Sequence, residues 1–441
     1  MKQTISNRSR AFFREHRAIL IVMLLLLIER IIAMLALSYE YTLKDDDWAY
    51  VISGIVFANT GTIIMHGDLS AQIMPGMPVF LGLISLIFGE GRLYLLVVKI
   101  LWTLMGTFTA YFIYRSVCLF APKWCGVVAA LPLFAPNLVW LDQLVLTETP
   151  YIFCSAAMIY FTLQMGKSEK KRYFWLCALC YLLTLMLKAN AGVYPLFAAI
   201  YLLLVRYDWK KLLRQGVILV CLTAALLTPW TIRNEKLFHA FIPLTYGSGN
   251  PMLLGTYQGE GWPEDDTLDY AANVDAPMAE KFADYYDENG NVREDYYIRY
   301  LMLERDAIRA KYRMREWLKR DPCSFFRAYL MDKPGIMVNR VYYEQSIFGT
   351  TLDQLNHLRY FFSLLVTGLF FLAFVLKRRR SVMLFLALVY TGNIFIYSFT
   401  LAYQRYGQTL THIWYIMLGI GLPLLIEAGK RAVRACKTFQ R

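Results

Sequence analysis

Charged residues are scarce in this chain. Asp, Glu, Lys and Arg make up only 18% of its 441 residues, whereas 57% are hydrophobic. A soluble globular protein carries about 25% charged residues, so this composition excludes an ordinary soluble domain. The long apolar runs that alternate with short polar stretches indicate an integral membrane protein.

Cysteine is nearly missing from the one large polar region, residues 231–357, which contains only Cys323. A disulfide framework is therefore excluded there. The chain also lacks a phosphate-binding glycine loop and a dinucleotide fingerprint. It shows no repeat of about 20 to 50 residues and no low-complexity tract, so nothing supports a solenoid or a long linker.

The net charge of +13 comes from Lys and Arg that stand in short clusters between the apolar runs. Such clusters mark cytoplasmic loops, so the excess charge reports membrane topology and not nucleic-acid binding. The clusters lie at residues 8–17, 115–123, 167–172, 206–214 and 377–380, and in the tail from residue 430.

Ten apolar segments are candidate membrane-spanning helices. They cover residues 18–38, 93–114, 124–141, 147–166, 173–188, 191–205, 213–230, 358–376, 382–401 and 409–427. Ten crossings put every basic cluster and both termini on the cytoplasmic side. We therefore expect a multi-pass protein of the plasma (inner) membrane, whose first span is a retained anchor because no cleavage site follows it.

The segment MPGMPVFLGLISLIFG (74–89) is apolar but short, opens with two prolines and ends in glycine. Counting it as an eleventh span would move later basic clusters outside. We expect a re-entrant or interfacial helix in the first outer loop, and an ordinary short transmembrane helix is the alternative.

The expected fold class is an all-α polytopic bundle of about ten transmembrane helices. A membrane module covers residues 1–230, including the first outer loop at 39–92. A mainly helical outer segment follows at 231–357, and the last helices and a basic tail occupy 358–441. Within the outer segment, the alternating charges and spaced apolar residues of 294–320 predict one exposed helix that ends before Pro322.

Three consecutive carboxylates, Asp45, Asp46 and Asp47, directly follow the first span, where charge is costly. On a helical period, Asp46 lies with Tyr50 and Ser53 opposite an apolar stripe that could rest on the bilayer. The stripe consists of Trp48, Val51, Ile52, Ile55 and Val56. A helix N-terminus favours a nearby carboxylate, which accounts for Asp45 or Asp47 but less well for three in a row.

These stretches carry a resemblance. DDDWAYVISGIVFANTG (45–61) followed by MPGMPVFLGLISLIFG (74–89) resembles the first outer loop of the GT-C glycosyltransferases. The likeness is to the bacterial branch related to protein O-mannosyltransferases and lipid A aminoarabinose transferases (glycosyltransferase family 39-like). The matching residues are Asp46, Asp47, Tyr50, Gly61, Pro75 and Pro78.

Three further segments resemble the family in the same order along the chain. They are LTETPYIF (146–153), TPWTIRN (228–234) and QRYGQTLTHIWYIM (404–417). The chain departs from the protein mannosyltransferases proper, because it has neither their Asp-Glu pair nor their inserted soluble module. That departure leaves the acceptor open.

The resemblance implies an enzyme that transfers a hexosyl or pentosyl group from a polyprenyl-phosphate donor to an acceptor hydroxyl at the outer membrane face. The acceptor would be a cell-envelope glycan, lipid or protein. A carboxylate is needed as general base, and we expect Asp46 in this role, with Asp47 second. A cation must stabilise the leaving phosphate, and we expect Arg405 beside Tyr406, with Lys188 as a second candidate.

Other residues of these motifs are candidates for substrate binding: Tyr50, Glu148, Arg233 and Asn234. Apart from Tyr50, each of these candidates has a purely structural alternative, as have the two cations. Arg405 and Lys188 are also typical of cations that anchor a helix at the membrane interface. Glu148 suits a helix N-terminus, and Arg233 and Asn234 suit capping or loop packing. Glu29 and Arg30 stand inside the first span, where ionisable residues suggest function, but the sequence indicates no role for them.

We expect no metal and no other cofactor. The outer-side candidates for metal ligands, without HxxxH or CxxC spacing among them, are Asp46, Asp47, His66, Asp68, His239 and His357. Some relatives use a divalent cation, so a metal stays an alternative that the spacing does not support. The missing glycine loop disfavours a nucleotide-sugar donor.

The competing class is a lipid-linked sugar flippase or another polytopic transporter. Transporters often show two matching halves with interrupted helices near the membrane midplane. This chain shows no such pairing, and its polar residues gather toward one face. A catalytically silent protein of the same fold is a third possibility. The expected partners are the lipid-linked donor, the acceptor and membrane lipids, with no nucleic acid.

Overall fold

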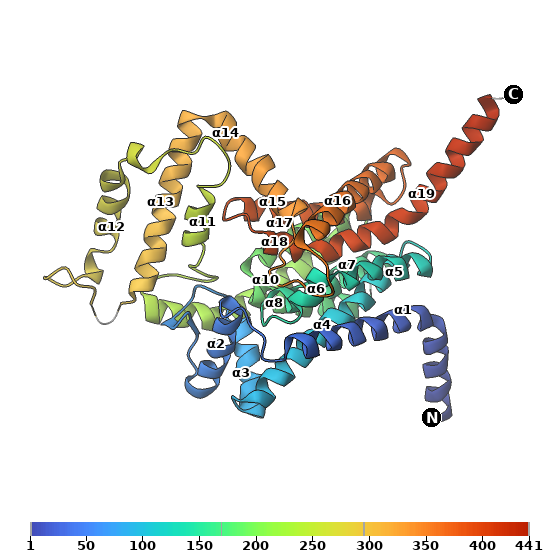
Figure 1. Cartoon of the computed structure of the whole chain (residues 1–441), viewed down its shortest axis with the longest axis horizontal. Helices are drawn as coiled ribbons and strands as arrows, with labels where there is room; N and C mark the ends of the chain where they lie inside the picture. The colour runs from blue at the N-terminus through green and yellow to red at the C-terminus, as the bar shows by residue number, and fades with distance from the viewer. Residues whose placement is uncertain (1, 169, 294–295, 440–441) are drawn as a thin grey trace.

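The computed structural model describes residues 2–168, 170–293 and 296–439, and helices dominate it (Figure 1). The only sheet in these ranges is a small hairpin of β1 (Ile64–Met65) and β2 (Asp68–Leu69). The expected all-α polytopic bundle is therefore confirmed.

Six helical segments of the described chain are long and apolar enough to cross a membrane. They belong to α1 (Lys2–Leu37), α4 (Arg92–Cys118), α10 (Trp209–Phe238), α16 (Leu352–Val375), α17 (Arg380–Ser398) and the run from α18 (Gln404–Gln408) into α19 (Thr411–Phe439). Each coincides with a predicted span. Helix α1 bends at His16, whose backbone is not helical, and its apolar part, Phe13–Leu37, begins close to this bend.

The other four predicted spans are also helical but shorter or more polar. They correspond to α5 (Lys123–Ala130) with α6 (Pro136–Leu141), and to α7 (Glu148–Ser168), α8 (Lys171–Leu187) and α9 (Tyr194–Leu204). The predicted span at 124–141 is interrupted by a 3-10 turn at Leu131–Phe134, between α5 and α6. Helix α7 is buried along most of its length, so packing, and not contact with lipid, decides its residues.

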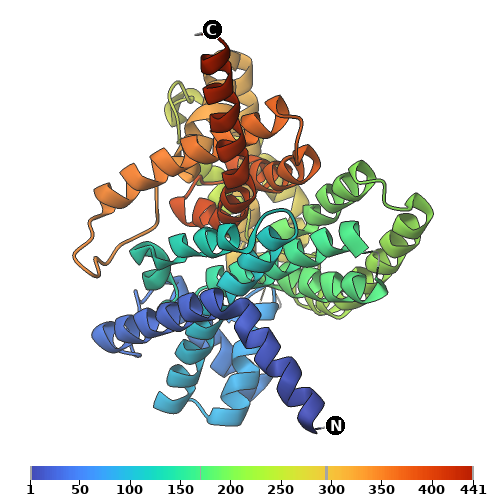
Figure 2. The ribbon, with the colours of Figure 1, turned by 90° about the vertical axis from the view of Figure 1, so that its right-hand side faces the viewer.

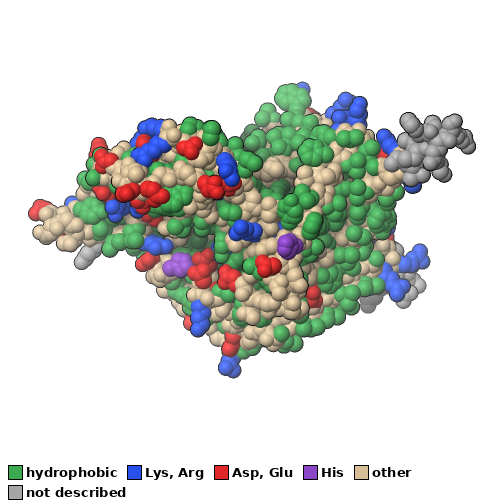
Figure 3. Space-filling model, turned by 45° about the horizontal axis from the view of Figure 1, so that its top comes forward, with side chains coloured by type: hydrophobic (Ala, Val, Ile, Leu, Met, Phe, Trp, Pro, Cys, Tyr) green, Lys and Arg blue, Asp and Glu red, His purple; other side chains and the backbone are tan. Residues whose placement is uncertain are grey.

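The green helices α8, α9 and α10 stand together on one side of the bundle when it is viewed from the end that carries the termini (Figure 2). Helix α10, unlike the buried α7, has few buried residues, because only 6% of its most apolar stretch is buried inside the protein. Hydrophobic side chains also cover much of the bundle's flank in Figure 3, while charged side chains gather over the outer segment. Both features are typical of a lipid-facing bundle.

The first outer loop folds into two packed helices, α2 (Asp46–Thr60) and α3 (Gly76–Phe88). Helix α2 ends at Gly61, whose positive φ of 70° is the left-handed conformation that glycine adopts without strain. With 13 residues, α3 is only about 20 Å long, too short to cross the hydrocarbon core alone. Its length fits the expected re-entrant or interfacial helix.

The outer segment contains α11 (Gly249–Gly255), α12 (Ala276–Lys281), α13 (Ile298–Arg320), α14 (Pro322–Arg327) and α15 (Lys333–Asn339). It lies at the end of the bundle opposite the start of α1 and the end of α19 (Figure 1). The predicted exposed helix is α13, which ends just before Pro322; residues 294–295 of the prediction lie outside the described residues. Buried Arg313 ties α13 to the preceding loop through Asp265, Thr256 and Tyr270.

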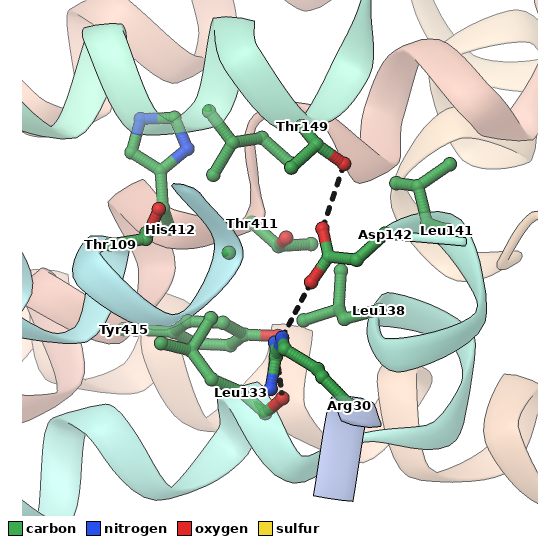
Figure 4. A pocket seen from close by; sticks show the side chains of 12 residues that line it. Arg30, Thr109, Leu133, Leu138, Leu141, Asp142, Thr149, Thr411, His412 and Tyr415 are labelled. Carbon is green, nitrogen blue, oxygen red and sulfur yellow. Dashed lines mark hydrogen bonds and ion pairs between the residues drawn. The ribbon is translucent and has the colours of Figure 1, made fainter. Parts of the chain in front are cut away.

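The sequence indicated no role for Arg30, and the structure provides one. Arg30 Nε donates to Asp142 Oδ2 at 2.7 Å, and the Thr149 hydroxyl donates to the other oxygen of Asp142 at 2.7 Å (Figure 4). Arg30 also donates to the backbone oxygen of Leu133. Neighbouring Glu29 comes only within 3.9 Å of Arg30. A buried ion pair thus fastens α1 to the connection between α6 and α7.

Removing one member of a buried ion pair leaves the other charge uncompensated, which costs about 3–5 kcal/mol. We therefore expect Asp142→Leu to lower the thermal midpoint of the detergent-solubilised protein sharply. The double variant Arg30→Met with Asp142→Leu should recover most of the loss, because no lone charge remains. If the double variant is no more stable than the single one, the ion pair is not what makes Asp142 important.

The expected orientation can be tested with a native cysteine, since Cys323 is exposed on α14. A membrane-impermeant maleimide should label Cys323 in cells whose plasma membrane is intact, and Cys323→Ser should remove this label. A cysteine introduced by Arg378→Cys, between α16 and α17, should react only after lysis. The reverse pattern would contradict the predicted topology.

Candidate active site

A cavity of about 490 Å³ lies between the membrane bundle and the outer segment. Its walls come from the start of α2, the hairpin turn, the end of α8, the end of α17, α18 and the outer helices α11 and α13. A concave space of this size with converging polar groups is typical of a ligand site.

Asp46 lies in the first turn of α2 and lines this cavity. Its Oδ2 accepts a hydrogen bond from Arg405 Nη2 at 2.8 Å, and its Oδ1 lies 3.2 Å from His66 Nε2. Burial alone would raise the pKa of Asp46, but the hydrogen bond from His66 and the charge of Arg405 outweigh it and hold that pKa well below its usual range. Asp46 is therefore ionised at neutral pH.

Glu148, at the start of α7, is completely buried and has two cationic partners. Lys188 Nζ lies 2.8 Å from its Oε1, and Arg405 Nε lies 3.2 Å from the same oxygen. Arg405 thereby joins Glu148 to Asp46. The two carboxylates and two cations come from four segments far apart in the sequence, and we call them the charge network.

Aromatic rings line the cavity beside the charge network. Tyr406 stacks on Tyr397 with ring centroids 4.6 Å apart, and Lys188 Nζ lies 5.3 Å from the Tyr406 centroid. Tyr50, one helical turn after Asp46, is 8% exposed and faces the same cavity. Stacked rings next to cations offer a surface for a sugar ring or a phosphate.

Close backbone packing positions Arg405. A Cβ atom added to Gly407 would collide with the backbone oxygen of Met337, so only glycine lets α18 lie this close to α15. On the other side of the cavity, Gly76 allows the start of α3 to lie against Met186 near the end of α8. These contacts set the distance between Arg405, Lys188 and the first outer loop.

The three aspartates have separate environments. Asp45 is exposed and makes no side-chain cap. Asp47 is 2% exposed and points away from the cavity, where it accepts hydrogen bonds from the Thr42 hydroxyl and from the backbone of Leu43 and Trp48. The predicted roles thus separate in space: Asp46 lines the cavity, whereas Asp47 fastens the start of α2.

Arg233 and Asn234 do not line the cavity. Arg233 donates to the backbone oxygens of Ser70 and Ile63, and Asn234 donates to that of Ile242. They hold the hairpin loop to the end of α10. This position matches the structural alternative that the sequence left open for both residues, and it does not bring them to the charge network.

Two residues of the site were not predicted in their observed roles. His66 was considered only as a metal ligand, and it lies in the hairpin turn with a φ of 53° that aims it at Asp46. Asn190, next to Lys188, donates to Asn393 and to Tyr151 and lines the cavity. The sequence His66-Gly67-Asp68 is typical of a tight turn, and this turn was the signal that could have drawn attention to His66. No local sequence pattern marks Asn190.

Metal binding finds no support in this geometry. Among the residues described, no three His, Cys, Asp or Glu side chains converge to hold an ion. Among the described residues, Asp46 and His66 form a pair without a third ligand of these types, and the guanidinium of Arg405 already occupies the other oxygen of Asp46. The expected absence of a cofactor stays a prediction.

Comparison with known proteins identifies the fold. Residues 73–232 match the family described as dolichyl-phosphate-mannose-protein mannosyltransferase. This segment includes Glu148 and Lys188 but not Asp46 or Arg405. No curated protein is significantly similar to the chain in sequence.

Two solved structures of an oligosaccharyltransferase from Archaeoglobus fulgidus, the first of them named AglB, are similar over nearly the whole chain. One, in complex with an inhibitory peptide and a dolichol-phosphate, is 13% identical with a TM-score of 0.54 and covers 96% of this chain. The other, in the apo form, is 13% identical over the same 96% with a TM-score of 0.55. This chain has the GT-C glycosyltransferase fold.

The predicted resemblance to GT-C glycosyltransferases is thereby confirmed. The chain spans about half the length of AglB, since it covers 52% of that protein. ArnT from Cupriavidus metallidurans bound to undecaprenyl phosphate is also similar, with 12% identity, 92% of this chain and 78% of ArnT covered, and a TM-score of 0.42.

The His66–Asp46 contact predicts that the stability of this protein depends on pH. The hydrogen bond to Asp46 raises the pKa of His66 against the effect of burial. Stability from protonated His66 is therefore fully present below the unfolded value of about 6.5 and is lost as the pH rises through the raised value. Asp46 stays ionised across this window because its pKa is lowered.

We expect wild-type protein to be more stable than His66→Gln at about pH 6, by less than about 1 kcal/mol because the pair is partly exposed. The difference should disappear near about pH 9. Thermal unfolding in detergent at both pH values measures it. A difference that does not change with pH would show that His66 acts without its charge.

Proposed function

We propose that this protein is a membrane glycosyltransferase that transfers a sugar from a polyprenyl-phosphate donor to an acceptor hydroxyl. The reaction would occur at the outer face of the plasma membrane, with both termini in the cytoplasm. The observation that carries the proposal is the charge network, in which a cavity-lining carboxylate, Asp46, touches a guanidinium that a phosphate could also bind.

The donor phosphate is assigned to Arg405 and Lys188. Both cations lie at the cavity and both share the buried oxygen of Glu148. A guanidinium can hold two phosphate oxygens with its planar fork, whereas the ammonium of Lys188 acts as a point charge. Tyr406, whose ring lies beside Lys188, is assigned to the donor phosphate as well. The archaeal relative's structure contains a dolichol-phosphate, which supports a lipid-linked phosphate as the ligand class.

Asp46 is assigned as general base. As the acceptor oxygen bonds to the anomeric carbon, the bond from that carbon to the phosphate oxygen breaks and the phosphate leaves on the lipid. The acceptor hydroxyl gives its proton to Asp46. In the free protein Arg405 keeps Asp46 weakly basic, and a phosphate that draws Arg405 toward itself would make Asp46 a stronger base at the moment it is needed.

Tyr50 and Glu148 complete the site in different ways. Tyr50 lines the cavity next to Asp46 and is available to contact the sugar or the acceptor. Glu148 is completely buried, so its role is to hold Lys188 and Arg405 at a fixed spacing. The predicted substrate contact of Glu148 is thus replaced in our proposal by the positioning of the two cations.

A flippase or transporter remains the competing class. Transporter sites typically lie near the membrane midplane between matching halves. In this protein the charge network lies instead where the bundle meets the polar outer segment. We therefore favour chemistry at the membrane surface over passage through the membrane.

The proposal predicts different effects for neighbouring aspartates. Asp46→Asn should fold normally yet lose nearly all transfer, because an amide takes up no proton, a loss on the order of 3–5 kcal/mol of transition-state stabilisation. Asp45→Asn, at an exposed side chain, is the matched control and should be mild. Initial rates of sugar transfer in membranes measure both.

A rate above about a tenth of wild type in Asp46→Asn, equal to about 1.4 kcal/mol, would show that Asp46 is not the base. Asp47→Asn separates the remaining cases. If only this variant is inactive and it is as stable as wild type, the base is Asp47. If it loses stability and activity together, Asp47 is structural, as its hydrogen bonds indicate.

A further inference from the structure

The cavity has a second polar wall, which the outer segment provides. Its residues include Thr245, Ser248, Asn250 and Arg299. Arg299 is the only one of the outer-segment lining residues that carries a full charge. This wall faces the same space as the charge network but belongs to a different part of the fold.

Arg299 lacks the partners that other arginines of α13 have. Arg305 pairs with Asp275, and Arg309 and Arg313 both pair with Asp265. Arg299 forms no ion pair with any residue in the described ranges. Its Nε atom, like that of Arg309, is buried without a hydrogen-bond partner there, but Arg309 pairs with Asp265 through its Nη2 atom. A buried donor that is left unsatisfied destabilises a protein.

The position of Arg299 on its helix is also unfavourable in the empty site. It is the second residue of α13, and the first turn of this helix contains no acidic residue. The partial positive charge of a helix N-terminus repels a cation. A negatively charged ligand would satisfy the guanidinium and the helix end together.

Arg299 is close to the base and is part of the wall that the membrane helices do not form. Both Arg299 and Asp46 line the cavity, and the charge of Arg299 slightly opposes the rise in the pKa of His66 that the hydrogen bond to Asp46 causes. The proposed donor phosphate, by contrast, would be held near the membrane helices by its lipid tail, and Arg405 and Lys188 line that side of the cavity. An anion at Arg299 would thus stand on the side from which a water-borne acceptor enters.

We propose that Arg299 binds an anionic group of the acceptor, a phosphate or a carboxylate, so that the enzyme acts on an acidic acceptor and discriminates against a neutral one. This inference rests on the proposed function, because it needs Asp46 to be the base beside which the acceptor hydroxyl is held. It makes Arg299 a specificity residue for the acceptor and not a ligand of the donor.

The test uses two anionic probes on the full-length protein in detergent. Undecaprenyl phosphate represents the lipid-anchored phosphate, and glycerol 1-phosphate represents a water-borne anion, with glycerol as its neutral counterpart. Calorimetric titration with glycerol 1-phosphate is carried out with undecaprenyl phosphate already saturating. Wild-type protein should bind glycerol 1-phosphate and not glycerol.

Arg299→Gln should weaken glycerol 1-phosphate binding by about tenfold or more, since hydrogen bonds to a charged group are lost, while undecaprenyl phosphate binding stays unchanged. Arg299→Lys should recover part of the affinity, because charge remains but the fork is lost. Lys311→Gln, which removes an exposed charge from the same helix, is the matched control and should bind both probes like wild type.

Three outcomes would overturn the inference. Wild-type protein that does not prefer glycerol 1-phosphate to glycerol has no anion site on this wall. If Arg299→Gln no longer binds undecaprenyl phosphate, Arg299 belongs to the donor site. If Arg299→Gln binds both probes as tightly as wild type, Arg299 binds neither ligand. Failure of undecaprenyl phosphate to bind wild-type protein, with glycerol 1-phosphate still bound, would instead contradict the proposed function.

Discussion

The buried carboxylate of Glu148 is the constraint around which the site is organised. A completely buried charge is costly unless opposite charges compensate it, and Glu148 has Lys188 at 2.8 Å and Arg405 at 3.2 Å. Because Arg405 must reach Glu148, its other nitrogen is brought to Asp46. One buried charge thereby fixes the relative positions of α2, α7, α8 and α18, which are separate along the chain.

The same arrangement gives the site its chemical character. Two carboxylates and two cations leave the membrane side of the cavity nearly neutral until a phosphate arrives. Arg299 on the outer wall stays uncompensated among the described residues. Two anionic groups could then bind at the same time to different cations, which keeps them apart and limits their repulsion. One would lie near the lipid, and the other would be held by the outer segment. The cavity is thus suited to bring a lipid-linked donor and a separate acceptor together at Asp46.

Local sequence patterns predicted the features that depend on residues close together in the chain, such as helix ends and helix faces. The charge pattern of α13 and Pro322 predicted that helix, and the helical period put Asp46 and Tyr50 on one face of α2. The pairing of Arg30 with Asp142, 112 residues away, could not be predicted, because ion pairs of this kind depend on tertiary packing. The sequence ranked Asp46 ahead of Asp47, but for the same reason it could not predict their separate environments. Asp47 fastens the start of its own helix, whereas Asp46 is bound by Arg405 from the far end of the chain. Family resemblance and the helical period together selected Asp46 in advance, and the resemblance, with its position after a predicted membrane helix, selected Arg405.

The central claim is that this cavity performs sugar transfer and not transport. The most direct measurement is consumption of a polyprenyl-phosphate sugar by the purified protein in detergent, where no sealed membrane exists. A panel of radiolabelled hexosyl and pentosyl polyprenyl phosphates, each assayed with acidic and neutral acceptor alcohols, would be used. The proposed mechanism predicts that wild-type protein releases polyprenyl phosphate and forms a glycosylated acceptor, and that Asp46→Asn does neither. Protein that binds these lipids, leaves them intact in detergent and moves them across the membrane of sealed vesicles would contradict it.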